Sequence, residues 1–189
     1  MPNYCFVLAF AAALLVLFAG DASAAEWRAD PAASRLTFIG TQGGSPFEGS
    51  FETFFATTHF DESNLQESKA AVSIDMASVR TGNAQRDDAV KGQDWFAVAT
   101  YPKAQFETKA FRRVGENRYE ADAVLTIRNV SRPVVLTFAL TEVGDATRAT
   151  GDLVINRTVF GVGQGQWASA QLVAHEVTIR FDLLARPAR

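Results

Sequence analysis

Alternation of apolar and polar residues is the feature that most limits how this chain can fold, and it is clearest near the C-terminus. Between residues 173 and 183 every odd position except His175 is apolar, whereas the even positions from 176 to 182 are polar. A period of two is typical of a β-strand with one buried face, because successive side chains point to opposite sides of a sheet. The same pattern recurs in seven earlier segments, at 35–41, 47–60, 72–76, 104–113, 119–128, 133–141 and 153–159.

Two irregularities interrupt this pattern. In the second segment the apolar residues change from odd to even positions, which predicts a β-bulge near Thr53 to Phe55. A polar stretch then follows the third segment, and its residues 84–92 are predicted to form one short helix. The whole connection to the next strand has about twenty residues, and connections of that length in compact domains are commonly functional or lid-like.

Eight strands, each with one apolar face, predict an all-β fold. Closing such a sheet into an antiparallel barrel removes its exposed edges, and eight strands are enough to enclose one small ligand. A two-sheet β-sandwich has the same alternation and stays open as an alternative.

The N-terminus predicts export. Residues 6–18 are continuously apolar, and the small residues Ala22 to Ala25 follow, which is typical of a signal peptide cleaved after Ala24. The apolar run is shorter than the roughly 20 residues that a membrane-spanning helix needs. We therefore expect a signal peptide at 1–24, a single domain at 25–189, a periplasmic location and no integral membrane segment after cleavage.

Composition limits the chemistry that is available. The one cysteine, Cys5, lies in the signal peptide, so the mature chain has no thiolate ligand, disulfide or cysteine nucleophile. Of the two histidines, His59 is predicted to face outward and His175 inward. We expect no metal and no cofactor. The net charge of −3, or −2 without Asp21, gives no indication of a nucleic-acid partner.

Several motifs, in a fixed order, resemble the YceI-like family of exported polyisoprenoid-binding proteins. They are Trp27–Pro31 with Ser34, Phe47–Phe51, Arg86–Asp87, Asp94–Phe96 with Tyr101–Pro102, Leu125–Ile127, Arg132–Val134, Arg157–Gly163 and Glu176–Ile179. The resemblance spans nearly all of 27–185. It implies a lipocalin-like barrel whose apolar tunnel carries a long isoprenoid without acting on it. The segment from Phe38 to Phe47 is similar to a subgroup found beside b-type membrane cytochromes, which implies a quinone as the isoprenoid.

The predicted ligand-binding residues are the inward side chains and the aromatic residues near them. They are Leu36, Phe38, Phe51, Phe54, Ile74, Trp95, Phe96, Phe106, Leu125, Ile127, Leu136, Phe138, Arg157, Phe160, Trp167, His175, Ile179 and Phe181. Arg157 and His175 are the polar members. Two interpretations of the inward His175 stay open: it is a core histidine whose hydrogen bonds are made within the protein, or it hydrogen-bonds the head of the ligand together with Arg157. The alternative for the apolar members is that they fill a solid core.

Three functions remain open. The first is a periplasmic, non-enzymatic carrier of an isoprenoid lipid or quinone, in which residues 84–101 cover one end of the barrel. The second is a packed barrel that docks to a membrane b-type cytochrome or another redox protein without lipid, with a homodimer as a further association to consider. The third is a hydrolase or other enzyme, although no catalytic motif supports it.

Overall fold

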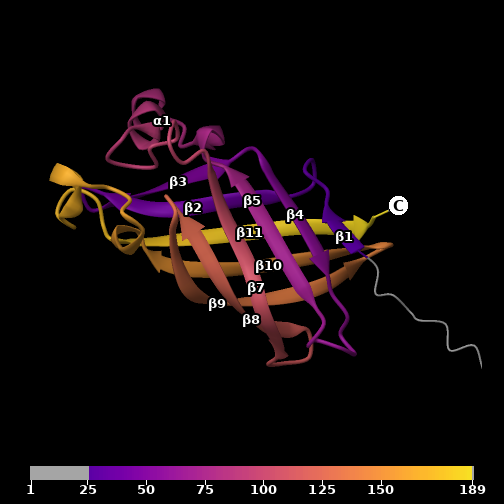
Figure 1. Ribbon diagram of the computed structural model, residues 1–189. Helices are drawn as coiled ribbons and strands as arrows, with labels where there is room; N and C mark the ends of the chain where they lie inside the picture. Colours follow the sequence, from indigo (N-terminus) through magenta and orange to yellow (C-terminus); the bar gives the residue numbers. More distant parts are fainter. Residues whose placement is uncertain (1–25, 189) are drawn as a thin grey trace, which may run out of the picture.

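The computed structural model describes residues 26–188, so the predicted signal peptide lies outside the described residues. These residues form antiparallel strands and one short α-helix (Figure 1). The strands are β1 (Glu26–Ala29), β2 (Arg35–Gln42), β3 (Ser45–Phe51), β4 (Phe54–His59), β5 (Lys69–Asp75), β6 (Val79–Arg80), β7 (Lys103–Arg113), β8 (Arg118–Ile127), β9 (Val130–Val143), β10 (Ala146–Asn156) and β11 (Glu176–Pro187). The α-helix is α1 (Ala84–Lys91), and the 3₁₀ helices are η1 (Met76–Ser78), η2 (Arg157–Phe160) and η3 (Gly165–Ala168).

The eleven strands of the described region amount to eight passes of the chain around one barrel. β1 and β2 both pair with β11, at different points along it, and therefore act as one interrupted strand. Two further passes are interrupted in the same way. β3 and β4 form one pass, and β5 and β6 form the next, because β3 pairs with β6 and β4 pairs with β5. The ring closes because β1 pairs with both β4 and β11. The predicted eight-stranded barrel is confirmed, and the β-sandwich is excluded.

The break between β3 and β4 replaces the predicted bulge. Residues 52 and 53 leave the strand, so Phe51 and Phe54 both reach the interior despite their odd spacing. Ser78 in η1 stabilises this break, since its Oγ accepts from the Thr53 N–H at 3.1 Å and its carbonyl accepts from the Glu52 N–H at 3.3 Å. The change of the apolar residues from odd to even positions therefore correctly indicated an irregular backbone here.

The seventh predicted strand ends earlier than the sequence pattern indicated. β10 stops at Asn156, whose Oδ1 accepts the Thr158 N–H at 2.9 Å and begins η2. The alternation consequently fails beyond this point, and Val159, which was expected to face inward, is 43% exposed. A side chain that caps a turn has here replaced strand pairing.

The predicted helix is confirmed as α1, which lies at one end of the barrel (Figure 1). The side-chain oxygen of Asn83 accepts the Arg86 N–H at 3.0 Å and caps the helix. Only Val90 of this helix is buried. The helix is polar because it covers the end of the barrel and does not pack into its core.

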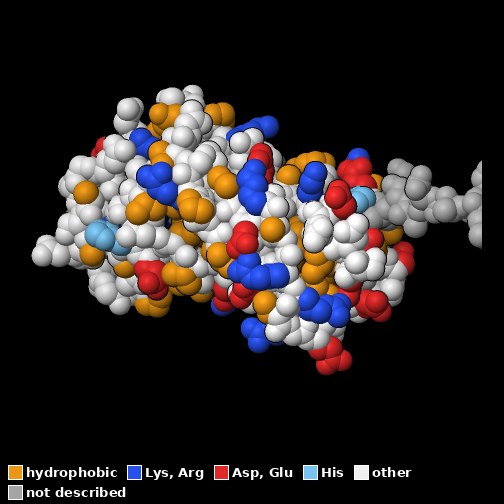
Figure 2. Space-filling view, turned by 60° about the horizontal axis from the view of Figure 1, so that its bottom comes forward, with side chains coloured by type: hydrophobic (Ala, Val, Ile, Leu, Met, Phe, Trp, Pro, Cys, Tyr) orange, Lys and Arg blue, Asp and Glu red, His pale blue; other side chains and the backbone are white. Residues whose placement is uncertain are grey.

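The outer surface is polar and the interior is apolar. Figure 2 shows acidic and basic side chains interspersed with small apolar groups over one face. Some form pairs across neighbouring strands, as Arg180 does with Asp152 at 2.9 Å. At the end away from α1, the rings of Phe60 and Phe111, and of Phe60 and Tyr119, pack edge to face with centroids 5.3 Å apart. This aromatic cluster fills part of the barrel at that end.

Candidate ligand-binding site

Two cavities occupy the barrel interior, with volumes of about 390 and 410 Å³. The α1-side cavity lies beneath the helix, and the far cavity extends toward the aromatic cluster. Four side chains line both cavities and form what we call the waist. They are Leu36, Ile74, Leu125 and Ile179, from β2, β5, β8 and β11. Each volume is within the range typical of small-molecule sites.

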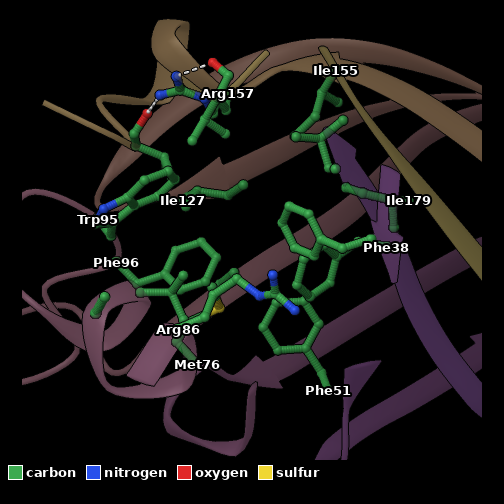
Figure 3. Close-up of a pocket in the computed structure, with 18 of the residues that line it drawn as sticks. Phe38, Phe51, Met76, Arg86, Trp95, Phe96, Ile127, Ile155, Arg157 and Ile179 are labelled. Carbon is green, nitrogen blue, oxygen red and sulfur yellow. Dashed lines mark hydrogen bonds between the residues drawn. The ribbon is translucent and has the colours of Figure 1, made fainter. Parts of the chain in front are cut away.

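The α1-side cavity is walled mainly by aromatic and aliphatic side chains (Figure 3). From the predicted set it contains Phe38, Phe51, Trp95, Phe96, Ile127, Arg157 and Trp167, in addition to the waist. Trp95 and Trp167 lie with ring centroids 5.6 Å apart, although they come from different connections of the chain. The segment after α1 and the segment before β11 thus meet over this end of the barrel.

The far cavity contains the other predicted wall residues. They are Phe54, Phe106, Leu136, Phe138 and Phe181, again with the waist. All but two of the predicted ligand-binding side chains therefore line one or other cavity. The two exceptions are Phe160 and His175.

The prediction that His175 faces the interior is wrong. This residue lies at a bend immediately before β11 begins at Glu176, so the alternation of the strand does not extend to it. Its Nε2 lies 2.8 Å from the carbonyl oxygen of Ala168, outside both cavity linings. Phe160 is also misplaced as a wall residue, because η2 turns it into the packed core, where it is 1% exposed.

Arg157 lines the α1-side cavity but has no N–H group left for a ligand. Its Nε donates to the Ala174 carbonyl at 2.9 Å, and its two terminal nitrogens donate to four more main-chain carbonyls. Those carbonyls belong to Val162, Gly163, Trp167 and Val173, at 2.8, 3.2, 2.6 and 2.8 Å. A guanidinium has five N–H groups, so all are used. The prediction that Arg157 bonds a head group is therefore wrong, and its role is to hold the 162–174 segment in place.

Arg157 is buried and has no carboxylate partner among residues 26–188, which has an electrostatic consequence for its side chain. The side chain is only 3% exposed, and this burial lowers the pKa of its guanidinium. The carbonyl dipoles around it stabilise the charge in place of an anion.

Arg86 belongs to a motif of the family resemblance but was not among the predicted ligand-binding residues, although it lines the α1-side cavity. Figure 3 shows its side chain extending among the rings of the cavity wall. Its guanidinium carbon lies 4.1 Å from the centroid of the Phe47 ring. The sequence contained one signal that Arg86 has a role other than stabilising the helix. A cation in the first turn of a helix is unfavourable, because it opposes the helix dipole.

Glycines on β2 and β3 keep the cavity open. A Cβ atom on Gly49 would lie 2.3 Å from Cζ of Phe38, and one on Gly40 would lie 2.8 Å from Cζ of Phe47. The absence of side chains at these positions lets both rings lie against the wall. Phe38 and Phe47 thus line the α1-side cavity without filling it.

The chemistry of the interior is that of an apolar container. Residues 26–188 contain no cluster of three or more His, Cys, Asp or Glu side chains that could hold a metal ion. Within the same range, no helix is both long enough and apolar enough to cross a membrane. An elongated apolar molecule would be held in these cavities by burial against their walls.

Comparison with known proteins agrees with this geometry. The model of the YceI-like domain matches residues 27–185. A UPF0312 protein of Photorhabdus laumondii is 34% identical over 138 residues, which cover 71% of each chain. The crystal structure of BcnA from Burkholderia cenocepacia superimposes with a TM-score of 0.80 at 35% identity, covering 82% of this chain and 98% of BcnA.

A more distant structure shares the fold. A domain from Saccharophagus degradans, described as a polyisoprenoid binding domain implicated in plant cell wall breakdown, has a TM-score of 0.70 at 18% identity. The alignment covers 86% of this chain and 98% of that domain. Since the family model spans most of the chain and the barrel is the same, this protein belongs to the YceI-like family.

Proposed function

We propose that this protein is a non-enzymatic carrier that holds a long isoprenoid lipid or isoprenoid quinone inside its barrel, in the periplasm, after removal of residues 1–24. The observation that carries the proposal is the pair of apolar cavities that share one waist. Together they offer an elongated space for a chain-like molecule. The description of the Saccharophagus domain as polyisoprenoid-binding supports the same class of ligand.

Burial alone can supply the affinity for such a ligand. Removing apolar surface from water contributes about 25 cal/mol per Å², so a long isoprenoid tail needs no charged anchor to bind tightly. The rings of Phe38, Phe51 and Phe96 provide large rigid surfaces for this contact.

The segment after α1 covers one end of this container. Main-chain N–H groups of Gly163 and Gln164 both donate to the Asp94 carbonyl at 2.7 Å, which joins the segment to the one before β11. Arg128 donates to the Gln93 carbonyl at 2.8 Å from the β8–β9 turn. We infer that residues 84–101 act as the lid of the barrel.

Mass spectrometry of organic extracts from natively purified mature protein tests the proposal. We expect an isoprenoid lipid or quinone to co-purify. Leu125→Trp, which fills the waist, should reduce its yield, whereas Val154→Trp on the exposed outer face of β10 should not. Absence of a co-purified lipid, together with no uptake of added long-chain isoprenoids or quinones, would overturn it.

The same purified protein distinguishes the carrier from the two alternatives, an enzyme and a docking protein. Chemical change in a lipid incubated with the protein would indicate an enzyme. Capture of a membrane b-type cytochrome by lipid-free protein would favour the docking function. That partner and the homodimer stay predictions.

A further inference from the structure

Arg86 differs from Arg157 in how its hydrogen-bonding groups are used. Its Nε donates to Thr81 Oγ1 at 2.9 Å, and one terminal nitrogen donates to the Thr81 carbonyl at 3.0 Å. The other terminal nitrogen has only a long contact, 3.4 Å, to Oε1 of Gln42. Partners among residues 26–188 thus take three of the five N–H groups, and one remains on each terminal nitrogen.

The positive charge of Arg86 also lacks a directly paired anion. No carboxylate oxygen of the described chain lies within 4.0 Å of its guanidinium, whereas Arg148 and Arg180 on the outer surface each pair with one carboxylate and Arg112 pairs with two. Arg86 is half-buried and faces a cavity wall that is otherwise mostly apolar. A charge in such surroundings gains most from an anionic partner, because the local environment screens it less than water does.

Thr81 fixes the direction of this charge. Its hydroxyl donates to Asp87 Oδ1 at 2.6 Å and accepts from Arg86 Nε, so the three side chains form a short chain of hydrogen bonds. The Thr81 main-chain N–H donates to the same carboxylate oxygen at 2.7 Å. Asp87 Oδ1 thus accepts both of its hydrogen bonds from Thr81, and the two hydrogen bonds from Arg86 to Thr81 hold the guanidinium at the cavity wall beside the Phe47 ring.

We propose that Arg86 binds the head group of the ligand and selects lipids that end in an ionised oxyanion, a phosphate or a carboxylate. This inference rests on the proposed function and adds an orientation to it. The head lies at the α1 end, and the tail passes the waist toward Phe138 in the far cavity. A neutral quinone carbonyl can accept a hydrogen bond there but leaves the charge without a counterion.

Four lipids with the same geranylgeranyl tail test this selection: the monophosphate, the carboxylic acid, the alcohol and a menaquinone. Calorimetric titration of the mature wild-type protein should show the two anions binding more tightly than the alcohol or the menaquinone. Comparison of the monophosphate with the carboxylic acid identifies which anion the protein prefers. Equal affinity for all four, or a preference for the menaquinone, would overturn the proposal while leaving the carrier function intact. Failure to bind any of them would count against the carrier itself.

Arg86→Gln should weaken binding of the anions by about 10- to 100-fold, the loss expected for a charge-assisted hydrogen bond, and leave the alcohol within about twofold. Arg180→Gln on the outer face is the matched control and should change none of the four affinities. Anion affinity of the wild type should also fall with ionic strength more steeply than that of Arg86→Gln. A uniform loss for all four lipids in Arg86→Gln would assign the residue a structural role only.

Thr81 serves as a positioning residue, and two variants test that role. Thr81→Val removes the hydroxyl and should lower anion affinity without affecting the alcohol, whereas Thr81→Ser keeps the hydroxyl and should restore anion affinity. Loss of alcohol binding in Thr81→Val, or no rescue by Thr81→Ser, would contradict it.

Discussion

The guanidinium of Arg157 lies over Trp95, with its central carbon 5.2 Å from the ring centroid. This contact joins η2, which follows β10, to the segment that follows α1. Both residues line the α1-side cavity, so the same contact closes the barrel and shapes its interior. The end of the barrel is therefore organised by one buried cation and the carbonyls around it.

Replacing Arg157 by Met should destabilise the protein strongly. Five main-chain carbonyls would lose their donor, and we expect the free energy of unfolding to fall by about 3–5 kcal/mol. Urea denaturation measures this change. Arg148→Met, which removes an exposed pair with Asp182, is the control and should cost about 0–1 kcal/mol. Similar losses in both variants would contradict the structural role of Arg157.

Placing a methyl group at Gly49 should reduce the space for ligand. The new Cβ would lie 2.3 Å from Phe38 Cζ, so the ring must move off the wall into the cavity. We expect Gly49→Ala to cost about 1–3 kcal/mol in stability and to lower uptake of a long-chain isoprenoid. Gly115→Ala, in the β7–β8 turn, is the control. Unchanged uptake by Gly49→Ala would show that Phe38 does not limit the cavity.

Filling the waist should shorten the ligand that the barrel accepts. Leu125 lines both cavities and is 3% exposed, so Leu125→Trp should block passage between them. We expect geraniol to bind nearly as well as before and geranylgeraniol to lose about tenfold or more in affinity, because its tail no longer reaches the far cavity. Fluorescence titration with both alcohols checks this. Equal losses for the two would indicate general damage to the barrel.

Acid should weaken the link between α1 and the barrel. The hydrogen bond from the Thr81 hydroxyl is the main cause that lowers the pKa of Asp87 below its usual value of 3.8. A carboxylate with a lowered pKa in the folded state stabilises it above pH 3.8, and this contribution is lost as the pH falls through the lowered value. Wild type should therefore lose more stability than Asp87→Asn on acidification below about pH 4. Thermal melting across that range measures the difference, and parallel curves would contradict it.

Much of the barrel could be predicted because strand alternation is a local property. Residues 119–127 alternate without interruption, and the inward side chains from Tyr119 to Ile127 are all buried. The helix expected at 84–92 formed as α1 at 84–91, and the side chain that caps it, Asn83, acts on backbone groups of the next few residues. The change from odd to even apolar positions near Thr53 likewise located the break between β3 and β4, because it too reflects the local backbone.

The polar part of the site could not be predicted in this way. His175 stands at an odd position, like the inward residues of β11, but a bend places it outside the strand. Arg157 continues the pattern of β10, yet η2 and the returning 162–174 segment use all its donors. Arg86 lies on α1, which has only one buried residue. The sequence of this helix has no apolar periodicity that would show which side chains face the cavity.

The sequence by itself determined the strands, the short helix and most of the apolar wall, because these follow from the spacing of side chains along a regular backbone. Only the tertiary structure decided that the interior is hollow and which arginine is free to meet a ligand. Both depend on contacts between segments far apart in the chain, such as Phe47 with Arg86 and Arg157 with Val173. No local pattern encodes those distances, since they are set by closure of the whole barrel.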